Sequence, residues 1–149
     1  MNISKGKRNM RFRKLGKTNV DVSVLGFGCM RLPMIEGEDR IDEQEAVRII
    51  RNGIDNGINY LDTAYFYHNG ESERLVGKAV ADGYREKAYI ATKLPLGEVK
   101  CEEDVERIFN EQLSKLGVDY VDIYLIHSLI GFGNDISPSE ACRDSRNGR

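Results

Sequence analysis

Titratable side chains stand at or just after the ends of short apolar segments in this sequence. They are Asp62, Tyr67, Lys93 and His127. A carboxylate, a phenol, an ammonium and an imidazole can together donate, accept and orient a proton. Each also has an ordinary structural explanation, such as loop hydrogen bonding for Asp62 or an interior imidazole for His127. Their recurrence at successive segment ends favours a site for acid-base chemistry.

A tyrosine is the member of this set that most needs its neighbours. A free tyrosine releases its proton only near pH 10, and an adjacent ammonium stabilises the phenolate. Lys93 can supply that positive charge, and a buried ammonium in turn needs a counter-charge such as Asp62. His127 can orient a substrate oxygen by a hydrogen bond. The four side chains therefore form a coherent proton-transfer set if the fold brings them together.

Strands and helices that alternate along the chain must position this set. Four short apolar runs are predicted as buried strands, at residues 24–28, 58–62, 88–92 and 121–126. Three amphipathic helices follow the first three runs, beginning at Asp42, at Ser72 and at about residue 102. Residues 11–15 and 21–23 flank a polar turn and are predicted to form a short hairpin before the first unit.

The predicted helices carry start and stop signals. Asp42 is followed three residues later by Glu45, which is the spacing of a capping box, and Ser72 is predicted to cap the second helix. Gly57, Gly83 and Gly117 follow the last apolar positions of the three helices.

Helices that return the chain to one end of a sheet force its strands to pair in parallel. Two architectures stay open, the doubly wound sheet and the closed β/α barrel. Gly26 and Gly28 lack the third glycine of a dinucleotide-binding turn, which weighs against the first. A closed barrel needs about 250 residues, and the chain has 149. We predict an α/β fold, an incomplete (β/α)8 TIM barrel with about four parallel strands and three helices after a short hairpin.

The composition limits the partners and the compartment. The chain mixes 22 basic and 24 acidic residues, so we expect neither a nucleic-acid nor a membrane partner. The cysteines Cys29, Cys101 and Cys142 are far apart in sequence, which argues against a disulfide framework or a metal site. We predict a cytoplasmic protein without a bound metal.

Four stretches of the sequence resemble motifs of the aldo-keto reductase family, in the family's order. They match its first βα loop, the signature around its catalytic tyrosine, its third strand and its fourth strand, and they are residues 25–31, residues 59–64 with Tyr67 and Glu73, residues 90–93 and residues 125–127. On this resemblance residues 10–127 form the N-terminal half of an aldo-keto reductase-like barrel. Residues 1–9 are predicted as a flexible leader and residues 128–149 as a disordered tail.

The resemblance implies reduction of an aldehyde or ketone to an alcohol, with NADP(H) as cofactor and a small carbonyl compound as substrate. It implies that Tyr67 is the acid and that Lys93 and Asp62 adjust it. It assigns His127 to the orientation of the carbonyl oxygen.

The resemblance also implies where the cofactor lies. The backbone around Gly28, Cys29 and Met30 lines the nicotinamide end of the cleft, with Asp62 beside it. The family holds the rest of NADPH with later strands. Nothing after His127 matches those strands, so we interpret the chain as a truncated or frame-altered product.

One residue departs from the common form of the family signature. Tyr67 is followed by His68, where many members have glycine. This feature resembles the subgroup whose longer members carry a C-terminal iron-sulfur region.

Two functional hypotheses follow. In the first, the chain is a reductase completed by self-association or by a complementing C-terminal half. In the second, it is a catalytically inactive half barrel that lacks most of the cofactor site. An open half barrel exposes strand edges and apolar surface, so we expect aggregation or dimerisation.

Overall fold

The computed structural model of the chain describes residues 10–128. Strands β1 (Phe12–Lys14) and β2 (Asp21–Ser23) pair antiparallel and confirm the predicted hairpin. The predicted leader at 1–9 and all of the predicted tail beyond Ser128 lie outside the described residues.

Four parallel strands form the sheet that carries the site. They are β3 (Phe27–Gly28), β4 (Tyr60–Asp62), β5 (Tyr89–Pro95) and β6 (Ile123–His127), in the spatial order β3-β4-β5-β6. Spatial order therefore follows chain order, with no reversal of the kind that defines the switch point of a doubly wound sheet.

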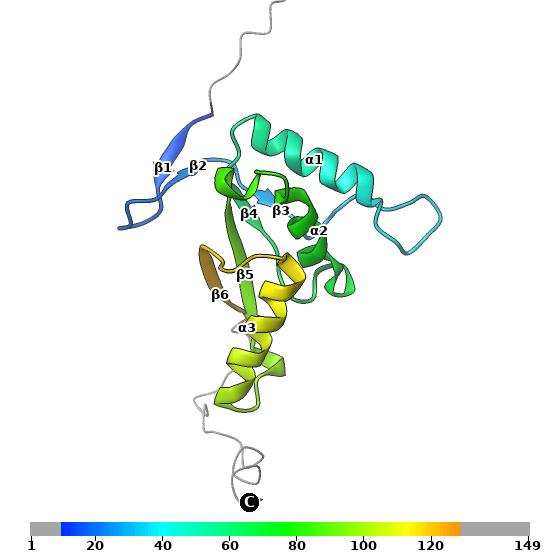
Figure 1. The fold of residues 1–149 in the computed structure, drawn as a ribbon, viewed down its shortest axis with the longest axis vertical. Helices are drawn as coiled ribbons and strands as arrows, with labels where there is room; N and C mark the ends of the chain where they lie inside the picture. Colours follow the sequence, from blue (N-terminus) through cyan, green and yellow to red (C-terminus); the bar gives the residue numbers. More distant parts are fainter. Residues whose placement is uncertain (1–9, 129–149) are drawn as a thin grey trace, which may run out of the picture.

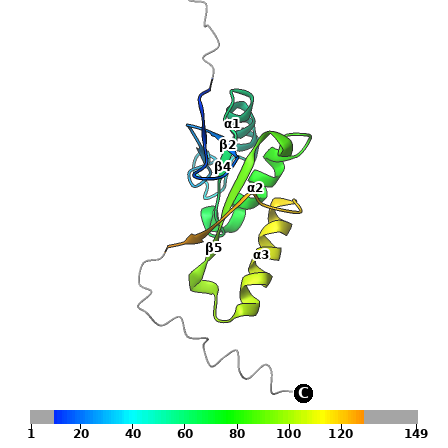
Figure 2. The ribbon, with the colours of Figure 1, turned by 90° about the vertical axis from the view of Figure 1, so that its left-hand side faces the viewer.

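Three helices pack on one face of this sheet, as Figures 1 and 2 show. They are α1 (Glu43–Asp55), α2 (Glu71–Val80) and α3 (Glu102–Leu116), and α2 contacts both of the others. Buried aliphatic side chains fill the layer between sheet and helices: Leu61 and Ile90 from strands, and Ile50, Val76 and Leu116 from helices. None of the described helices is long and apolar enough to cross a membrane.

The starts of the first two helices differ in how they are capped. The side chain of Asp42 accepts a hydrogen bond from the backbone N–H of Glu45, as predicted. Glu45 directs its own carboxylate to Arg48, so the reciprocal half of the capping box does not form. The prediction that Ser72 caps α2 is wrong, because that helix starts at Glu71 and Ser72 is buried inside its first turn.

Two strands have different lengths from those predicted. Strand β3 has two residues, because Val24 and Leu25 are exposed and make no ladder in the described sheet. Strand β5 continues to Pro95, because β6 pairs with it as far as His127. Lys93 is therefore two residues before the end of its strand and not at the end.

Candidate active site

The register of the sheet puts two of the predicted residues, Lys93 and His127, on the same face. Thr92 and Tyr124 point toward α3, where both bond Gln112. Side chains alternate between faces along a strand, so Lys93 lies on the face opposite the helices. Lys93 pairs with Leu125 in the ladder, and His127, two residues further along β6, lies on that same face.

Lys93 and Asp62 form an ion pair across neighbouring strands. The Lys93 Nζ lies 2.7 Å from the Asp62 Oδ1 and donates a second hydrogen bond of 2.6 Å to the backbone oxygen of Thr63. The Lys93 side chain is 12% exposed and that of Asp62 is 31% exposed. The ammonium is thus largely withdrawn from water and held by one carboxylate and one carbonyl.

Tyr67 lies in the loop between β4 and α2, and its ring contacts the Lys93 of this pair. The Lys93 Nζ is 4.6 Å from the centroid of the Tyr67 ring. The ring of His127 meets the Tyr67 ring edge to face, with 5.9 Å between the centroids. The structure thus brings together all four residues predicted as a proton-transfer set.

The backbone just after Tyr67 turns sharply. His68 and Asn69 have left-handed conformations, with φ of 51° and 56°, and Gly70 follows at 91°. The left-handed region costs an L-residue with a side chain about 1–2 kcal/mol, so surrounding contacts must compensate. One such contact comes from the backbone N–H of Leu32, which donates a 2.9 Å hydrogen bond to the His68 Nε2.

A second contact anchors the loop before Tyr67. The Tyr65 hydroxyl bonds both carboxylate oxygens of Glu111 on α3, at 3.2 and 3.1 Å, and the Lys115 Nζ lies 3.9 Å from the Tyr65 ring centroid. Burial, followed by the Glu111 hydrogen bond, raises the pKa of Tyr65, so its hydroxyl stays a donor. The loop is therefore tied on both sides of Tyr67.

A buried polar cluster supports the middle of β5 from the helix side. The Oε1 of Glu73, which is fully buried, accepts hydrogen bonds of 2.7 Å from Thr92 and from Gln112. Gln112 also donates to the backbone oxygen of Lys93 at 3.1 Å and accepts from the Tyr124 hydroxyl at 2.8 Å. Sequence reasoning noted Glu73 only as part of a motif and missed Gln112, which looks like any polar position on a helix.

The residues predicted to contact the cofactor differ in accessibility. Gly28 is exposed and a side chain there would meet nothing within 4 Å, and Met30 is 52% exposed. The backbone of Cys29 is committed internally, its N–H to Asp62 and its carbonyl to Ser72. The Cys29 side chain is fully buried, and burial raises its pKa to about 12. The surface over Gly28 is therefore open.

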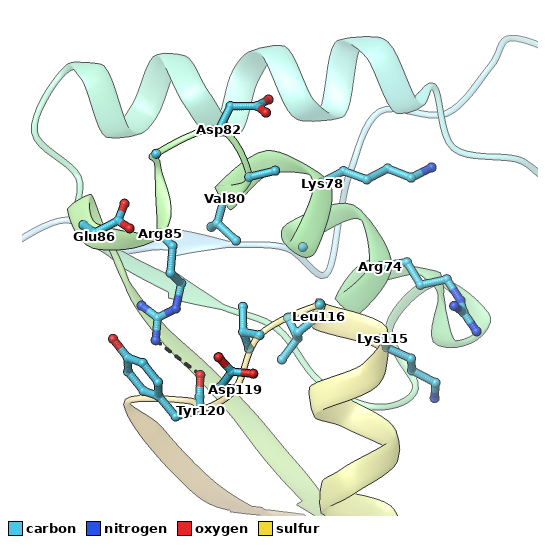
Figure 3. Close-up of a pocket in the computed structure, with 15 residues that line it drawn as sticks. Arg74, Lys78, Val80, Asp82, Arg85, Glu86, Lys115, Leu116, Asp119 and Tyr120 are labelled. Atoms are coloured by element: carbon cyan, nitrogen blue, oxygen red, sulfur yellow. Dashed lines mark hydrogen bonds between the residues drawn. The ribbon is translucent and has the colours of Figure 1, made fainter.

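Another hollow, of about 760 Å³, lies between the C-terminal ends of α2 and α3 (Figure 3). Val80 and Leu116 line it, and Arg85 donates across it to the backbone oxygen of Tyr120. Helix C-termini in βα units lie at the amino ends of the strands, whereas sites in such folds form at the carboxyl ends. We therefore place the candidate site at Tyr67 and not in this hollow.

Comparison with known proteins gives one family. The family model described as the aldo/keto reductase family matches residues 24–131. A Glycine max protein named "Probable aldo-keto reductase 1" is 38% identical over 122 residues, which are 76% of this chain and 35% of that protein.

Solved structures agree with this match. An aldo-keto reductase from Bacillus halodurans in its holo form is 36% identical with a TM-score of 0.66, covering 78% of this chain and 40% of the solved one. An aldo-keto reductase from Klebsiella pneumoniae in complex with NADPH is 29% identical with a TM-score of 0.63, covering 72% and 36%. The likeness confirms the predicted incomplete (β/α)8 barrel. The chain spans 35–40% of the length of these relatives. The likeness to an iron-sulfur subgroup stays a prediction.

Proposed function

Because the chain belongs to the aldo/keto reductase family, we propose that it reduces an aldehyde or ketone to an alcohol with NADPH. One observation carries the proposal. The Tyr67 ring contacts both the Lys93 ammonium and the His127 imidazole at the carboxyl edge of a parallel sheet, and a side chain at Gly28, the last residue of β3, would meet nothing within 4 Å.

In this proposal the Tyr67 hydroxyl donates a proton to the carbonyl oxygen of the substrate. The negative charge left on the phenolate is stabilised by the Lys93 ammonium, which already lies over the ring. Asp62 keeps Lys93 charged and in place through the 2.7 Å ion pair. His127, whose ring meets that of Tyr67, orients the carbonyl oxygen by a hydrogen bond.

The residues at the end of β3 fit the reactive end of the cofactor. Gly28 leaves room for a planar ring against the backbone, and the exposed Met30 flanks that space. When bound, NADPH supplies the hydride that adds to the carbonyl carbon. The complex of the Klebsiella pneumoniae relative with NADPH supports this choice of cofactor.

We propose that the rest of the barrel is supplied by a second copy of the chain or by a complementing C-terminal half. The free edges of β3 and β6 in the described sheet support this proposal, because an unpaired parallel edge favours a further strand. We further propose that the substrate is a small carbonyl compound. We also propose that the protein acts in the cytoplasm, since its three cysteines show no disulfide-like spacing.

The test is a cofactor titration followed by a rate measurement with purified chain. We expect quenching of NADPH fluorescence, and NADPH oxidation with members of a panel of aldehydes and ketones. Tyr67→Phe should lower the rate by about 10²–10⁴-fold, the usual contribution of a positioned acid, and should leave NADPH binding intact.

The matched control is Tyr120→Phe, because Tyr120 is an exposed tyrosine at the opposite end of the sheet. This variant should keep the full rate. A chain that neither quenches NADPH fluorescence nor oxidises NADPH with any carbonyl contradicts the proposal and leaves the inactive half barrel as the better description.

A further inference from the structure

His68 joins two loops that are far apart in sequence. Its Nε2 accepts the backbone N–H of Leu32, 36 residues earlier, at 2.9 Å. Leu32 is buried and belongs to the segment that leaves the end of β3, while His68 directly follows Tyr67. The loop with the proposed proton donor is thus bonded to the loop that borders the open space over Gly28.

The segment after β3 has two anchor points, and both lead to the region between β4 and α2. The first is Cys29, whose N–H bonds the backbone oxygen of Asp62 and whose carbonyl accepts from Ser72. The second is Leu32, held by His68. Between the anchors lie only Met30 and Arg31, and both are exposed. The second anchor therefore determines where this exposed pair lies relative to Tyr67.

We propose that His68, as a neutral imidazole protonated on Nδ1, is a positioning residue that fixes residues 28–32 against the loop of Tyr67. In relation to catalysis this inference rests on the proposed function, because it is the cofactor that would contact Met30.

The bond to Leu32 defines the protonation state of the ring. A backbone N–H can only donate, so Nε2 must offer a lone pair and the single ring proton must sit on Nδ1. In the imidazolium form both nitrogens carry protons, and Nε2 would then direct an N–H against the N–H of Leu32. Protonation of the ring therefore breaks the hydrogen bond between Leu32 and His68.

The surroundings of His68 favour the neutral ring. Burial lowers its pKa, and the positive charge of Arg31 lowers it further. Other charged groups line the adjoining hollow of about 330 Å³, from the loop before α1, from α1 and from α2, and they are Asp39, Arg40, Glu43 and Glu71. The three carboxylates in that set favour the charged ring and oppose this effect, but burial and Arg31 outweigh them. The hydrogen bond between Leu32 and His68 is thus formed at neutral pH and is lost on acidification.

Nitrogen NMR of the imidazoles tests the tautomer directly, because the sequence contains only two histidines, His68 and His127. We expect one ring with an unprotonated Nε2 and a protonated Nδ1 at neutral pH, assigned to His68 by its loss in a variant. Amide exchange gives the second measurement. The protection factor of the Leu32 amide should fall about fivefold as His68 becomes charged, the usual size of one net hydrogen bond.

Two variants of similar size separate the acceptor from the bulk of the ring. His68→Gln keeps an oxygen acceptor that does not titrate, so protection of the Leu32 amide should persist and lose its dependence on pH. His68→Leu has no acceptor, so protection should be about fivefold lower at every pH. Both variants place a side chain without special preference in the same left-handed conformation, so this strain is common to both. A lower thermal unfolding midpoint in His68→Leu than in His68→Gln should therefore report the lost hydrogen bond.

The effect on cofactor binding should follow the same pattern. His68→Leu should raise the KM for NADPH more than it changes kcat, wild-type protein should show this rise only in acid, and His68→Gln should show no pH dependence of that KM. An Nε2-protonated His68, or equal Leu32 protection in the Gln and Leu variants, overturns the inference. If the NMR and exchange results hold in a chain that oxidises no NADPH, the tie between the loops stands and the proposed reaction alone is refuted.

Discussion

At the level of single side chains, Lys93 depends on its neighbours. The Lys93 side chain is largely buried, and its ammonium donates hydrogen bonds to Asp62 and to the backbone oxygen of Thr63. A buried charge without its partner is costly, so the pair should be coupled in stability as well as in catalysis. Asp62 hydrogen-bonds Lys93 directly, whereas Lys93 interacts with Tyr67 through the face of the aromatic ring.

Replacement of Asp62 tests this coupling. Asp62→Asn should lower the free energy of unfolding by about 2 kcal/mol, less than the 3–5 kcal/mol of a fully buried pair, because Asp62 is partly exposed. Denaturant titration measures it. The double variant with Lys93→Met should lose clearly less unfolding free energy than the sum of the losses in the two single variants. Additive losses would show that the two residues do not interact.

The thiol of Cys29 should be unreactive in the folded chain. Burial raises its pKa to about 12, with a smaller contribution from the negative charge of Asp62, and the thiolate is the reactive form. Alkylation with iodoacetamide near neutral pH, followed by mass spectrometry, should modify Cys29 only when denaturant is added. Modification of Cys29 in native buffer at the rate of a free cysteine would contradict this burial.

Position along the chain predicted some site residues and concealed others. Asp62 and His127 could be predicted because each closes a strand, and the carboxyl ends of parallel strands share an edge. His68 was noted for its identity, but its contact with Leu32 joins two loops, and no periodicity relates their residues. Loop contacts of this kind depend on tertiary structure alone.

At the level of elements, α2 and α3 approach so closely that one position requires glycine. A Cβ on Gly77 would lie 2.3 Å from the backbone oxygen of Leu116, so the helices would have to separate. Alanine favours a helix over glycine by about 1 kcal/mol, but this gain is smaller than the cost of a clash with backbone.

Gly77→Ala should therefore destabilise the chain by about 2 kcal/mol, within the usual range for overpacking. Thermal and denaturant unfolding measure the loss. Gly97→Ala is the matched control, because a Cβ at Gly97 meets nothing within 4 Å, and it should change the stability by less than about 0.5 kcal/mol. A stabilising Gly77→Ala would show that the helices lie further apart.

The start of α3 should be sensitive to acid. The Asp104 carboxylate bonds Arg107 and the backbone N–H groups of Lys100 and Cys101, which lowers its pKa from 3.8 to about 2. A carboxylate with a lowered pKa in the folded state stabilises the fold above its unfolded pKa. This contribution is complete above about pH 4 and is lost as the pH falls toward 2.

Asp104→Asn should remove that part of the pH dependence. Urea midpoints measured between pH 2 and 5 should rise less steeply with pH in the variant than in the wild-type chain. Equal slopes would assign the acid sensitivity to other carboxylates.

Helices were easier to predict than strands for a physical reason. The helix predicted to begin at about residue 102 and to stop at Gly117 agrees with α3, since its apolar face repeats over four turns and Gly117 ends it in a left-handed conformation. The run at 24–28 is as apolar as a buried strand, but only Phe27 and Gly28 pair with β4. Short strands are defined by the partner beside them, which a local pattern does not contain.

On the scale of the whole molecule, the parallel pairing of the strands followed from the repeat of strand and helix. The choice between a doubly wound sheet and a barrel did not, because both use that repeat. The observed order β3-β4-β5-β6 and the likeness to solved relatives decide for the barrel. No described helix covers the face that carries Lys93 and Leu125.

That face and the free edge of β6 should make the chain self-associate. Leu125 is 38% exposed and Ile126 is 57% exposed, on opposite faces of the edge strand in the described sheet. We expect sedimentation velocity to show a mass that rises with protein concentration, since unpaired apolar edges attract further strands. The double variant Leu125→Lys with Ile126→Lys should shift the chain toward monomer, because charge on an edge strand opposes pairing. Tyr120→Lys, at a position that is 58% exposed and lies away from that edge, should leave association unchanged. A concentration-independent monomer in the wild-type chain would show that this edge needs no partner and would remove the main support for completion of the barrel by a second copy.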